Sequence, residues 1–519
     1  MEPQRVCHNT LDPVSVPGCP SATRVFALTH SRRIVFNDAP LLISFSLGLM
    51  RALAFASALL LTTQGAPSGD VDKPQPDPRG FAESWLKRTQ EQTHAPGLVL
   101  VLVQGDSVVS SVAIGVANQE TRQLMTPTTL FRIGSVTKSF TAAAVLTLAS
   151  QGRVELDKPI GHYLASLKNP LKTPTLRQLL SHTAGFKEVP PTGDVSLFEP
   201  HDNGAMHQMI VGWGPEMLFT APGEIFSYSS SDYALLGDLV STLMAKPYPE
   251  AMKDLVLKPL GMEHSVFRPT EAMTYAISQA HVPAQDGEMQ VHRPYMDNSD
   301  FWASGFMFST GEDLTRWVIS FLNNGNLGGR RALPPGVPEQ MIQIPAAKYR
   351  IAESRYGLGL EFSKLGDLDV VGHVGNLPGF TAYVRMIPSR KVGVVALANV
   401  DQAYLDEATN DALCYLLNKR PVSPTAITET DSGPALENFV GQYENASRVS
   451  IVLRNGQLFW LADPHDTHAS AAMRAGMPLR RIGSYRFARP YPGDVFFVLE
   501  STGKPRYVLL HDVAYKKID

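Results

Sequence analysis

Apolar runs rich in β-forming residues lie near both ends of the first 418 residues. Residues 97–118 form two β-rich runs on either side of Gly105-Asp106, a dipeptide typical of a hairpin turn. Strand patterns return between Tyr356 and Val400, in the runs GLGLEF, DLDVVGHV, FTAYVRMI and KVGVVALANV. The sequence therefore predicts an α+β fold, in which both ends of the domain assemble one antiparallel sheet.

Helical spacing is found between and around these strands. It predicts helices from Phe81 to about Thr93, from Ser135 to about Ser150, and from Asp401 to Asn418. Residues 156–345 mix helices with loops rich in proline and glycine. We expect the terminal helices to cover the sheet and a helical lobe to be inserted in the middle of a domain spanning residues 78–418.

A second domain is expected at the C-terminus. Residues 419–436 read as a linker, and residues 437–519 show only strand patterns. Asn455-Gly456 marks a hairpin within the run from Val449 to Leu461, and three more short strands follow it: 485–488, 495–499 and 507–510. A small β-barrel or curled sheet is the expected structure.

The N-terminal 77 residues read as a leader followed by a linker rich in proline and aspartate. Met50-Arg51, the apolar run to Leu61 and the small residues at Gly65 and Ala66 resemble a signal peptide over about residues 50–66. An uncleaved anchor over residues 39–61 and a mitochondrial presequence are the alternatives. We expect an exported protein, periplasmic or secreted, with membrane anchoring only if residues 39–61 are retained.

Composition narrows the classes of function. The 519 residues include 46 Lys and Arg against 49 Asp and Glu, so no excess of positive charge indicates nucleic-acid binding. Cys7 and Cys19 lie in the leader, which leaves Cys414 and argues against a disulfide framework or a cysteine zinc site. No H-E-x-x-H motif or clustered carboxylates occur, so no metal or cofactor is expected.

The pattern S-x-x-K offers a candidate nucleophile. It occurs at Ser84, Ser135 and Ser501, and about two matches are expected by chance in a chain of this length. Ser84 lies inside a predicted helix and Ser501 in a predicted hairpin turn, whereas Ser135 begins a long apolar helix. At that position a serine lies near free backbone N–H groups, and Lys138 lies one turn further on the same face.

Such a pair has two interpretations. A serine hydroxyl needs a neighbour to take its proton, and a lysine serves only if burial or nearby positive charge lowers its pKa. The alternative is that Ser135 is a helix cap and Lys138 a solvated charge. Other segments favour the chemical interpretation: Tyr228 stands on a polar loop in PGEIFSYSSSDYALLG, and His373 and Gly375 form the only H-x-G, after a predicted strand.

In the order Ser135, Tyr228, His373, these segments resemble the class C β-lactamase and D-alanyl-D-alanine peptidase family of serine hydrolases. Flanking segments carry the resemblance over roughly residues 78–418, among them FRIGSVTKSFTA, LDKPI, LRQLLSHTAGF, SGFMFSTGEDLTRW, YGLGL and GHVGNLPGF. It implies a β-lactamase/penicillin-binding-protein-like fold. The C-terminal unit is similar to the β domain appended to some members.

The resemblance also implies roles for individual residues. Ser135 would be the nucleophile, Lys138 its base or proton shuttle, and Tyr228 the tyrosine of the Y-x-N motif; which of the last two is the base stays open. His373 and Gly375 match the K-T-G motif. The backbone N–H groups of Ser135 and Asn376 would form the oxyanion hole, where each donor contributes about 3–4 kcal/mol in comparable enzymes.

Two positions depart from the family pattern. Ser230 replaces the Y-x-N asparagine, which weakens the expected amide contact to the substrate and to Lys138. His373 replaces the K-T-G lysine, which helps to hold a substrate carboxylate, and a histidine is mostly neutral at pH 7. Both changes argue against an efficient β-lactamase and favour an esterase or amidase that acts on less anionic substrates.

Other residues are expected to have structural rather than catalytic roles. His182 in LLSHTAGF is interpreted as structural, because Lys138 and Tyr228 already fill the base role. Tyr356 and Trp302 are expected in the core or the cleft wall, and the loops at residues 187–222 and 281–303 are expected to line the cleft. No G-x-S-x-G motif indicates an α/β-hydrolase.

The sequence therefore favours a serine hydrolase that forms an acyl-enzyme with a small-molecule or peptide substrate. The substrate is an ester or a D-amino-acid or cell-wall peptide, with weak β-lactamase activity allowed. The alternative is a non-catalytic relative that binds peptides or forms polymers. A third possibility is that the C-terminal domain is a binding module that positions the enzyme on a polymer or a partner.

Overall fold

The computed structural model describes residues 77–188, 198–199, 201–284, 287–349, 355–401, 403–420, 430, 432–464, 470–490, 493–510 and 512–518. The predicted signal peptide at about residues 50–66 and the leader up to residue 76 lie outside the described residues, so export stays a prediction. Residues 74–519 form one compact unit. Among the described residues, no helix has the length and apolar character needed to cross a bilayer.

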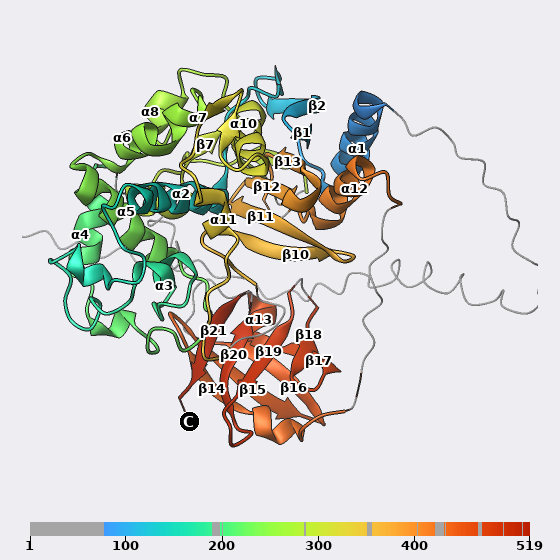
Figure 1. Ribbon diagram of the computed structural model, residues 1–519. Helices are drawn as coiled ribbons and strands as arrows, with labels where there is room; N and C mark the ends of the chain where they lie inside the picture. Colours follow the sequence, from blue (N-terminus) through green and yellow to red (C-terminus); the bar gives the residue numbers. More distant parts are fainter. Residues whose placement is uncertain are drawn as a thin grey trace, which may run out of the picture. The chain divides into compact units, whose positions relative to one another are not determined.

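A seven-stranded sheet organises the first domain (Figure 1). Its order is β10-β11-β12-β13-β1-β2-β3, and every pair of neighbours is antiparallel. Its strands are β1 (Gly97–Gln104), β2 (Ser107–Asn118), β3 (Gln123–Leu124), β10 (Glu361–Leu365), β11 (Leu368–Leu377), β12 (Phe380–Ile387) and β13 (Val392–Ala398). The contact between β1 and β13, with Leu98 opposite Ala398, confirms that both ends of the domain build the sheet.

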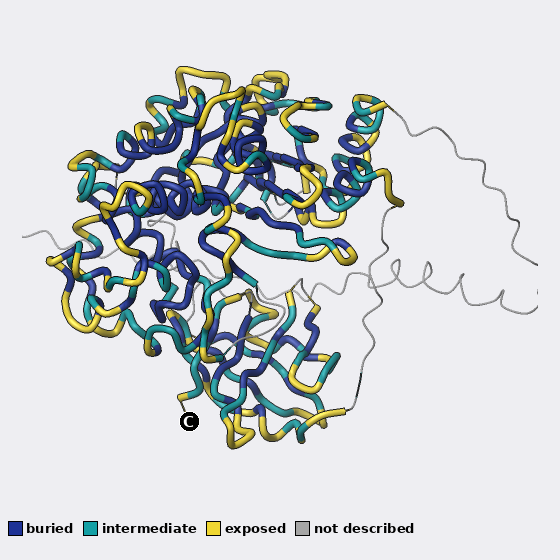
Figure 2. The backbone as a smooth tube through the Cα atoms, in the orientation of Figure 1, coloured by how far each residue is buried: buried dark blue, intermediate teal, exposed yellow. Residues whose placement is uncertain are grey.

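Helices cover both faces of this sheet, so β1 is buried on both sides (Figure 2). Leu98, Leu100 and Leu102 pack in one core with α1 (Pro78–Thr93) and α12 (Asp406–Leu416). The alternate valines of β1 pack in the other core with α2 (Thr137–Ser150) and α10 (Gly311–Leu322). This alternation follows from the two-residue period of a strand.

The middle of the chain forms the expected helical lobe between the strands. Its remaining elements are β4 (Phe131–Arg132), η1 (Gly134–Val136), η2 (Ile160–His162), α3 (Leu176–Leu180), α4 (Ala205–Gly212), η3 (Pro215–Met217), α5 (Ser230–Met244), α6 (Tyr248–Met252), η4 (Lys253–Leu257), α7 (Lys258–Leu260), α8 (Pro269–Ala272), β5 (His281–Pro283), β6 (Met289–Val291), η5 (Ser299–Phe301), α9 (Trp302–Gly305), β7 (Phe308–Ser309), β8 (Asn326–Leu327), β9 (Arg330–Arg331) and α11 (Val337–Met341). A 3-10 turn, η6 (Pro388–Arg390), connects β12 to β13.

The C-terminal domain is a closed barrel of eight strands in sequence order, which confirms the all-β prediction. Its elements are η7 (Leu436–Phe439), β14 (Gly441–Glu444), β15 (Arg448–Arg454), β16 (Gln457–Ala462), α13 (Ala471–Ala475), β17 (Met477–Gly483), β18 (Arg486–Ala488), β19 (Val495–Leu499), β20 (Pro505–Leu510) and β21 (Val513–Lys517). Its own apolar core includes Phe439, Trp460 and Phe497.

Two predicted boundaries were wrong. The run GLGLEF was expected to be a strand, but β10 begins only at Glu361, because Gly359 has a φ of +84° and turns the chain. The Gly359 carbonyl accepts a hydrogen bond from Ser139 Oγ in α2, so this apolar run packs as a loop. The last helix of the domain begins at Asp406 rather than at Asp401.

A buried arginine ties the lobe together beside the sheet. Arg132 is fully buried in β4 and donates to the carbonyl oxygens of Met296 at 2.8 Å and Phe267 at 3.3 Å, and to that of Phe306. It also pairs with Asp297 at 3.1 Å. Its partners span residues 267–306, so this one side chain fixes the backbone that precedes β7.

Replacement of Arg132 by methionine is expected to lower the free energy of unfolding by about 3 kcal/mol, because these buried acceptors lose their donor. Urea unfolding followed by tryptophan fluorescence measures the change. The matched control is Arg79→Met, whose side chain is 79% exposed and pairs only within α1; it is expected to change stability by less than about 0.5 kcal/mol. Equal unfolding midpoints for the two variants would contradict the assigned role.

Candidate active site

Ser135 lies in η1, the turn that leads from β4 into α2. Gly134 just before it has a φ of +52°, a conformation that favours glycine. Ser135 is only partly buried, whereas its neighbours on both sides are buried. The other two S-x-x-K serines lie as expected, Ser84 inside α1 and Ser501 in the turn between β19 and β20.

Lys138 faces Ser135 from the first turn of α2. Its Nζ lies 3.1 Å from Ser135 Oγ and donates a hydrogen bond of 2.8 Å to the carbonyl oxygen of Ser304. The side chain is 1% exposed, and burial lowers the pKa of Lys138 to about 8. The interpretation of Lys138 as a solvated surface charge is therefore wrong.

Tyr228 completes the predicted catalytic group. Its ring lies 4.7 Å from Lys138 Nζ, and its hydroxyl forms a hydrogen bond with Ser135. Burial raises the pKa of the Tyr228 phenol well above its usual value of 10, and the charge of Glu361 raises it further. The phenol therefore stays protonated at neutral pH.

The strand β11 closes the site from the side of the sheet. A Cβ on Gly375 would lie 2.0 Å from the carbonyl oxygen of Ile133 and 2.9 Å from the backbone nitrogen of Ser135. A Cβ on Gly134 would lie 2.7 Å from the backbone nitrogen of Asn376. Because neither glycine carries a side chain, β11 can approach η1 closely. The backbone nitrogens of Ser135 and Asn376, the predicted oxyanion donors, therefore both lie where these two elements meet.

Glu188 is a member of the site that the sequence did not single out. Its carboxylate accepts hydrogen bonds from the backbone nitrogen of Ser230 and from the side chains of Ser229 and Ser230. Burial raises the pKa of Glu188, and the charge of Lys138 lowers it. The family pattern places the amide of the Y-x-N asparagine next to this lysine. Here the carboxylate of Glu188 influences the pKa of Lys138 instead. Glu188 lies in the loop at residues 187–222 that was expected to line the cleft, but no motif marks it.

His373 lies on β11, close to the same group. Its Nε2 is 2.9 Å from the hydroxyl of Tyr356, and its Nδ1 is 2.7 Å from its neighbour's carbonyl oxygen and 3.2 Å from Glu361 Oε1. Burial, and to a smaller extent the charge of Lys138, lowers the pKa of His373 to about 3. The ring is therefore neutral, with Nδ1 as the donor and Nε2 as the acceptor. Burial also raises the pKa of Glu361 to about 8.

His182 supports Tyr228 by packing against it. The two rings have centroids 4.4 Å apart, and His182 Nδ1 lies 2.9 Å from Asp232 Oδ2. Burial lowers the pKa of His182 well below its usual value and raises that of Asp232 well above its usual value. A fully buried, neutral pair of this kind agrees with the structural interpretation of His182.

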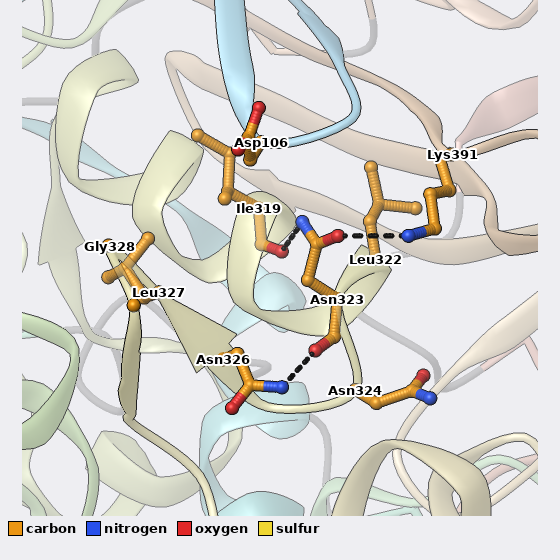
Figure 3. Close-up of a pocket in the computed structure, with 10 residues that line it drawn as sticks. Asp106, Ile319, Leu322, Asn323, Asn324, Asn326, Leu327, Gly328 and Lys391 are labelled. Carbon is orange, nitrogen blue, oxygen red and sulfur yellow. Dashed lines mark hydrogen bonds between the residues drawn. The ribbon is translucent and has the colours of Figure 1, made fainter.

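Two cavities of the first domain differ in their relation to the predicted site residues. A cavity of about 490 Å³ is lined by the end of α10 and by the loops that carry Asp106, Asn326 and Lys391 (Figure 3). The side chain of Asn323 donates to Ile319 and accepts from Lys391 there. None of the predicted site residues lines this cavity, whereas His373 and Glu361 line a small one of about 70 Å³ with Arg385 and Asp406.

The close approach of β11 to η1 gives a direct test of the site. Gly375→Ala is expected to lower the rate of Ser135 acylation about 100-fold, because the new Cβ would push one oxyanion donor away from the other. Stopped-flow or burst kinetics with an activated ester measures this rate. Gly212→Ala is the control, because a Cβ there would meet no atom within 4 Å. A rate for Gly375→Ala equal to that of the control would contradict the geometry.

Comparisons with known proteins identify relatives of the chain in sequence and in fold. The chain is 25% identical over 409 residues to Protein flp of Staphylococcus aureus (strain MW2), covering 76% of each chain. Its fold resembles the crystal structure of SurE, with a TM-score of 0.68, 22% identity and coverage of 85% of this chain and 99% of that one. It also resembles D-amino acid amidase from Ochrobactrum anthropi SV3, with a TM-score of 0.55, 23% identity and coverage of 66% and 97%.

These likenesses extend over the part of the chain that holds the site. Residues 82–415 match the family described as Beta-lactamase, and this range includes Ser135, Lys138, Tyr228 and His373. Membership of this family supports a serine hydrolase activity in general terms. The chain belongs to the β-lactamase family of serine hydrolases and penicillin-binding-protein-like proteins, with a C-terminal β-barrel attached.

Proposed function

We propose that the protein hydrolyses esters or amides through an acyl-enzyme on Ser135. The observation that supports this most directly is the contact of 3.1 Å between Lys138 Nζ and Ser135 Oγ. Because burial lowers the pKa of Lys138 to about 8, a useful fraction of the amine is neutral near neutral pH and able to accept a proton. A helix cap with a charged neighbour would need none of this burial.

In this reaction Lys138 is the base and Tyr228 relays the proton. Ser135 Oγ attacks the carbonyl carbon while its proton passes to Lys138, and the oxygen anion accepts hydrogen bonds from the backbone nitrogens of Ser135 and Asn376. The leaving group then departs with a proton returned through the Tyr228 hydroxyl. Water then attacks the carbonyl carbon of the acyl-Ser135 ester and passes its proton to Lys138. The proton returns through Tyr228 to Ser135 Oγ, which leaves as the hydroxyl while the acid is released. The raised pKa of Tyr228 favours this assignment, since a phenolate is scarce at neutral pH.

Among substrates, the site favours esters and amides whose leaving group carries no carboxylate. His373 stands where the family pattern has a carboxylate-binding lysine, and its pKa of about 3 keeps it neutral. Glu188 and Glu361 both act on Lys138, so an incoming carboxylate would meet like charges whenever they ionise. A neutral ester or a D-amino-acid amide with a free ammonium group fits better. The fold relatives described as a D-amino acid amidase and as SurE with D-Leu support D-amino-acid derivatives as the first substrates to test.

Intact-mass measurement with a fluorophosphonate, and separately with benzylpenicillin, tests the nucleophile. An adduct is expected on the parent protein and none on Ser135→Ala, while Ser84→Ala, which removes another S-x-x-K serine, reacts as the parent does. The labelling rate is expected to rise with pH and to level off above about pH 8, because the lowered pKa of Lys138 sets the fraction of neutral amine. Adduct on Ser135→Ala would overturn the assignment, and a parent that reacts with neither reagent would favour the non-catalytic alternative.

A substrate panel tests the preference for leaving groups without a carboxylate. The value of kcat/KM is expected to be at least about tenfold higher for a D-alanine ester or amide than for a peptide ending in D-Ala-D-Ala with a free carboxylate. His373→Lys is expected to narrow this ratio, because it supplies a cation to the carboxylate. His162→Lys, on an exposed turn, is the control. An unchanged ratio in His373→Lys would show that His373 does not select the substrate.

A further inference from the structure

The C-terminal barrel contacts the loop that carries the catalytic tyrosine. The backbone nitrogen of Tyr228 donates to the carbonyl oxygen of Asp512 at 2.8 Å, in the turn between β20 and β21. The backbone nitrogen of Ala514 donates to Ser227 Oγ at 3.1 Å. Ser227 and Ala514 are both buried. The main chain next to the Tyr228 ring is therefore held by hydrogen bonds from another domain.

An apolar seal surrounds these hydrogen bonds. Ile225, Phe226 and Tyr356 of the first domain pack in one cluster with four buried side chains of the barrel, Val498, Tyr507, Leu509 and Ala514. The hydroxyl of Tyr507 lies 2.7 Å from Thr220 Oγ1. Burial of this kind is typical of a permanent interface rather than of a tethered, independent module.

A single buried amide joins the two loops of the site. Asn445 is 1% exposed and follows β14 directly. Its Oδ1 accepts from the backbone nitrogen of Glu188 at 3.1 Å, and its Nδ2 donates to the carbonyl oxygen of Ala514 at 2.7 Å. Since one side of this amide faces a donor and the other an acceptor, its orientation is fixed by its partners.

We propose that Asn445 is a positioning residue for the acylation of Ser135. From the barrel it holds Glu188 next to Lys138 and, through Ala514, the loop of Tyr228. The proposal rests on the proposed function, because it assigns to the barrel the alignment of the groups that move the proton. It replaces the view of the barrel as a separate binding module with that of a structural part of the active site.

This position of Glu188 has an electrostatic consequence. Among the carboxyl groups near Lys138, Glu188 raises the pKa of Lys138 most, ahead of Glu361 and Asp232. The other titratable groups that face Lys138 are His182, His373, Tyr228 and Tyr233, which are neutral near pH 7. Release of Glu188 would therefore lower the pKa of Lys138, and the acid limb of the pH–rate profile would move to lower pH.

The test uses the full chain with Asn445→Leu, which keeps the branched shape of the side chain and removes its hydrogen bonds to Glu188 and Ala514, together with the local one from the backbone nitrogen of Ala446. The control is Asn438→Ala, an exposed asparagine of the same domain. Ser227→Ala, which breaks the link from the other side, serves if Asn445→Leu does not fold. Rates of fluorophosphonate labelling, kcat and KM for a small ester, and the pH profile are measured for each folded variant, together with Asn445→Leu in a Glu188→Gln background.

Asn445→Leu is expected to lower kcat and the labelling rate about tenfold with little change in KM, because the loops of Glu188 and Tyr228 lose their shared hydrogen-bonding partner. Its acid limb should move to lower pH, and its effect should shrink in the Glu188→Gln background, because the two residues act together. Ser227→Ala should also lower kcat.

The results distinguish a failure of the positioning role from a failure of the proposed function. A reactive parent with Asn445→Leu indistinguishable from Asn438→Ala, or with strictly additive effects of Asn445→Leu and Glu188→Gln, would overturn the positioning role alone. An unreactive parent would overturn the proposed function and the positioning role with it.

Discussion

The contact between β11 and η1 is the constraint on which the rest of the site depends. Gly375 lies so close to Ile133 and Ser135 that a Cβ on it would not fit. A Cβ on Gly134 would likewise lie too close to the backbone nitrogen of Asn376. Both glycines must therefore stay glycines for the sheet and the helical lobe to meet at this distance. The lobe supplies Ser135 and Lys138, the sheet supplies Asn376 and His373, and the contact aligns the two sets. A shift of β11 by the width of a methyl group would separate the predicted oxyanion donors.

Burial turns this alignment into chemistry. Lys138 loses its hydration at the start of α2, and the carbonyl oxygen of Ser304 replaces only part of it, so its pKa falls to about 8. The same burial keeps His373, Asp232 and Tyr228 neutral. Glu188 opposes the effect on Lys138, because a nearby carboxylate favours the charged amine. In the proposed reaction, the reactivity of Ser135 is thus a balance between desolvation, which frees Lys138 to act as the base, and this carboxylate, which restrains it.

The barrel belongs to this balance. It supplies the acceptor for the backbone nitrogen of Tyr228 and the amide that binds the backbone of Glu188. Parts of the chain almost 300 residues apart in the printed sequence, such as Tyr228 and Asp512, therefore meet at one loop. In the C-terminal domain, the Asn455-Gly456 turn predicted β15 and β16, whereas β14, β17 and β21 carry too few alternating apolar residues to be recognised. These short strands persist because barrel closure pairs each of them on both sides.

The sequence by itself determined the elements whose cause is local. Short apolar runs rich in β-forming residues and bounded by turn signals located β1, β2 and β11 to β13, and helical spacing located α1 and α2. The order of Ser135, Lys138, Tyr228 and His373 indicated the family and the chemistry. The tertiary structure alone decided which other groups reach Lys138. Glu188 and Glu361, which act on Lys138, stand in no motif, and neither does Asn445, which binds the backbone of Glu188. The effect of each depends on burial and on separations of a few ångströms between segments distant in the chain. A sequence records which side chains can ionise or donate a hydrogen bond, but the dielectric and the partners that set their behaviour exist only after folding.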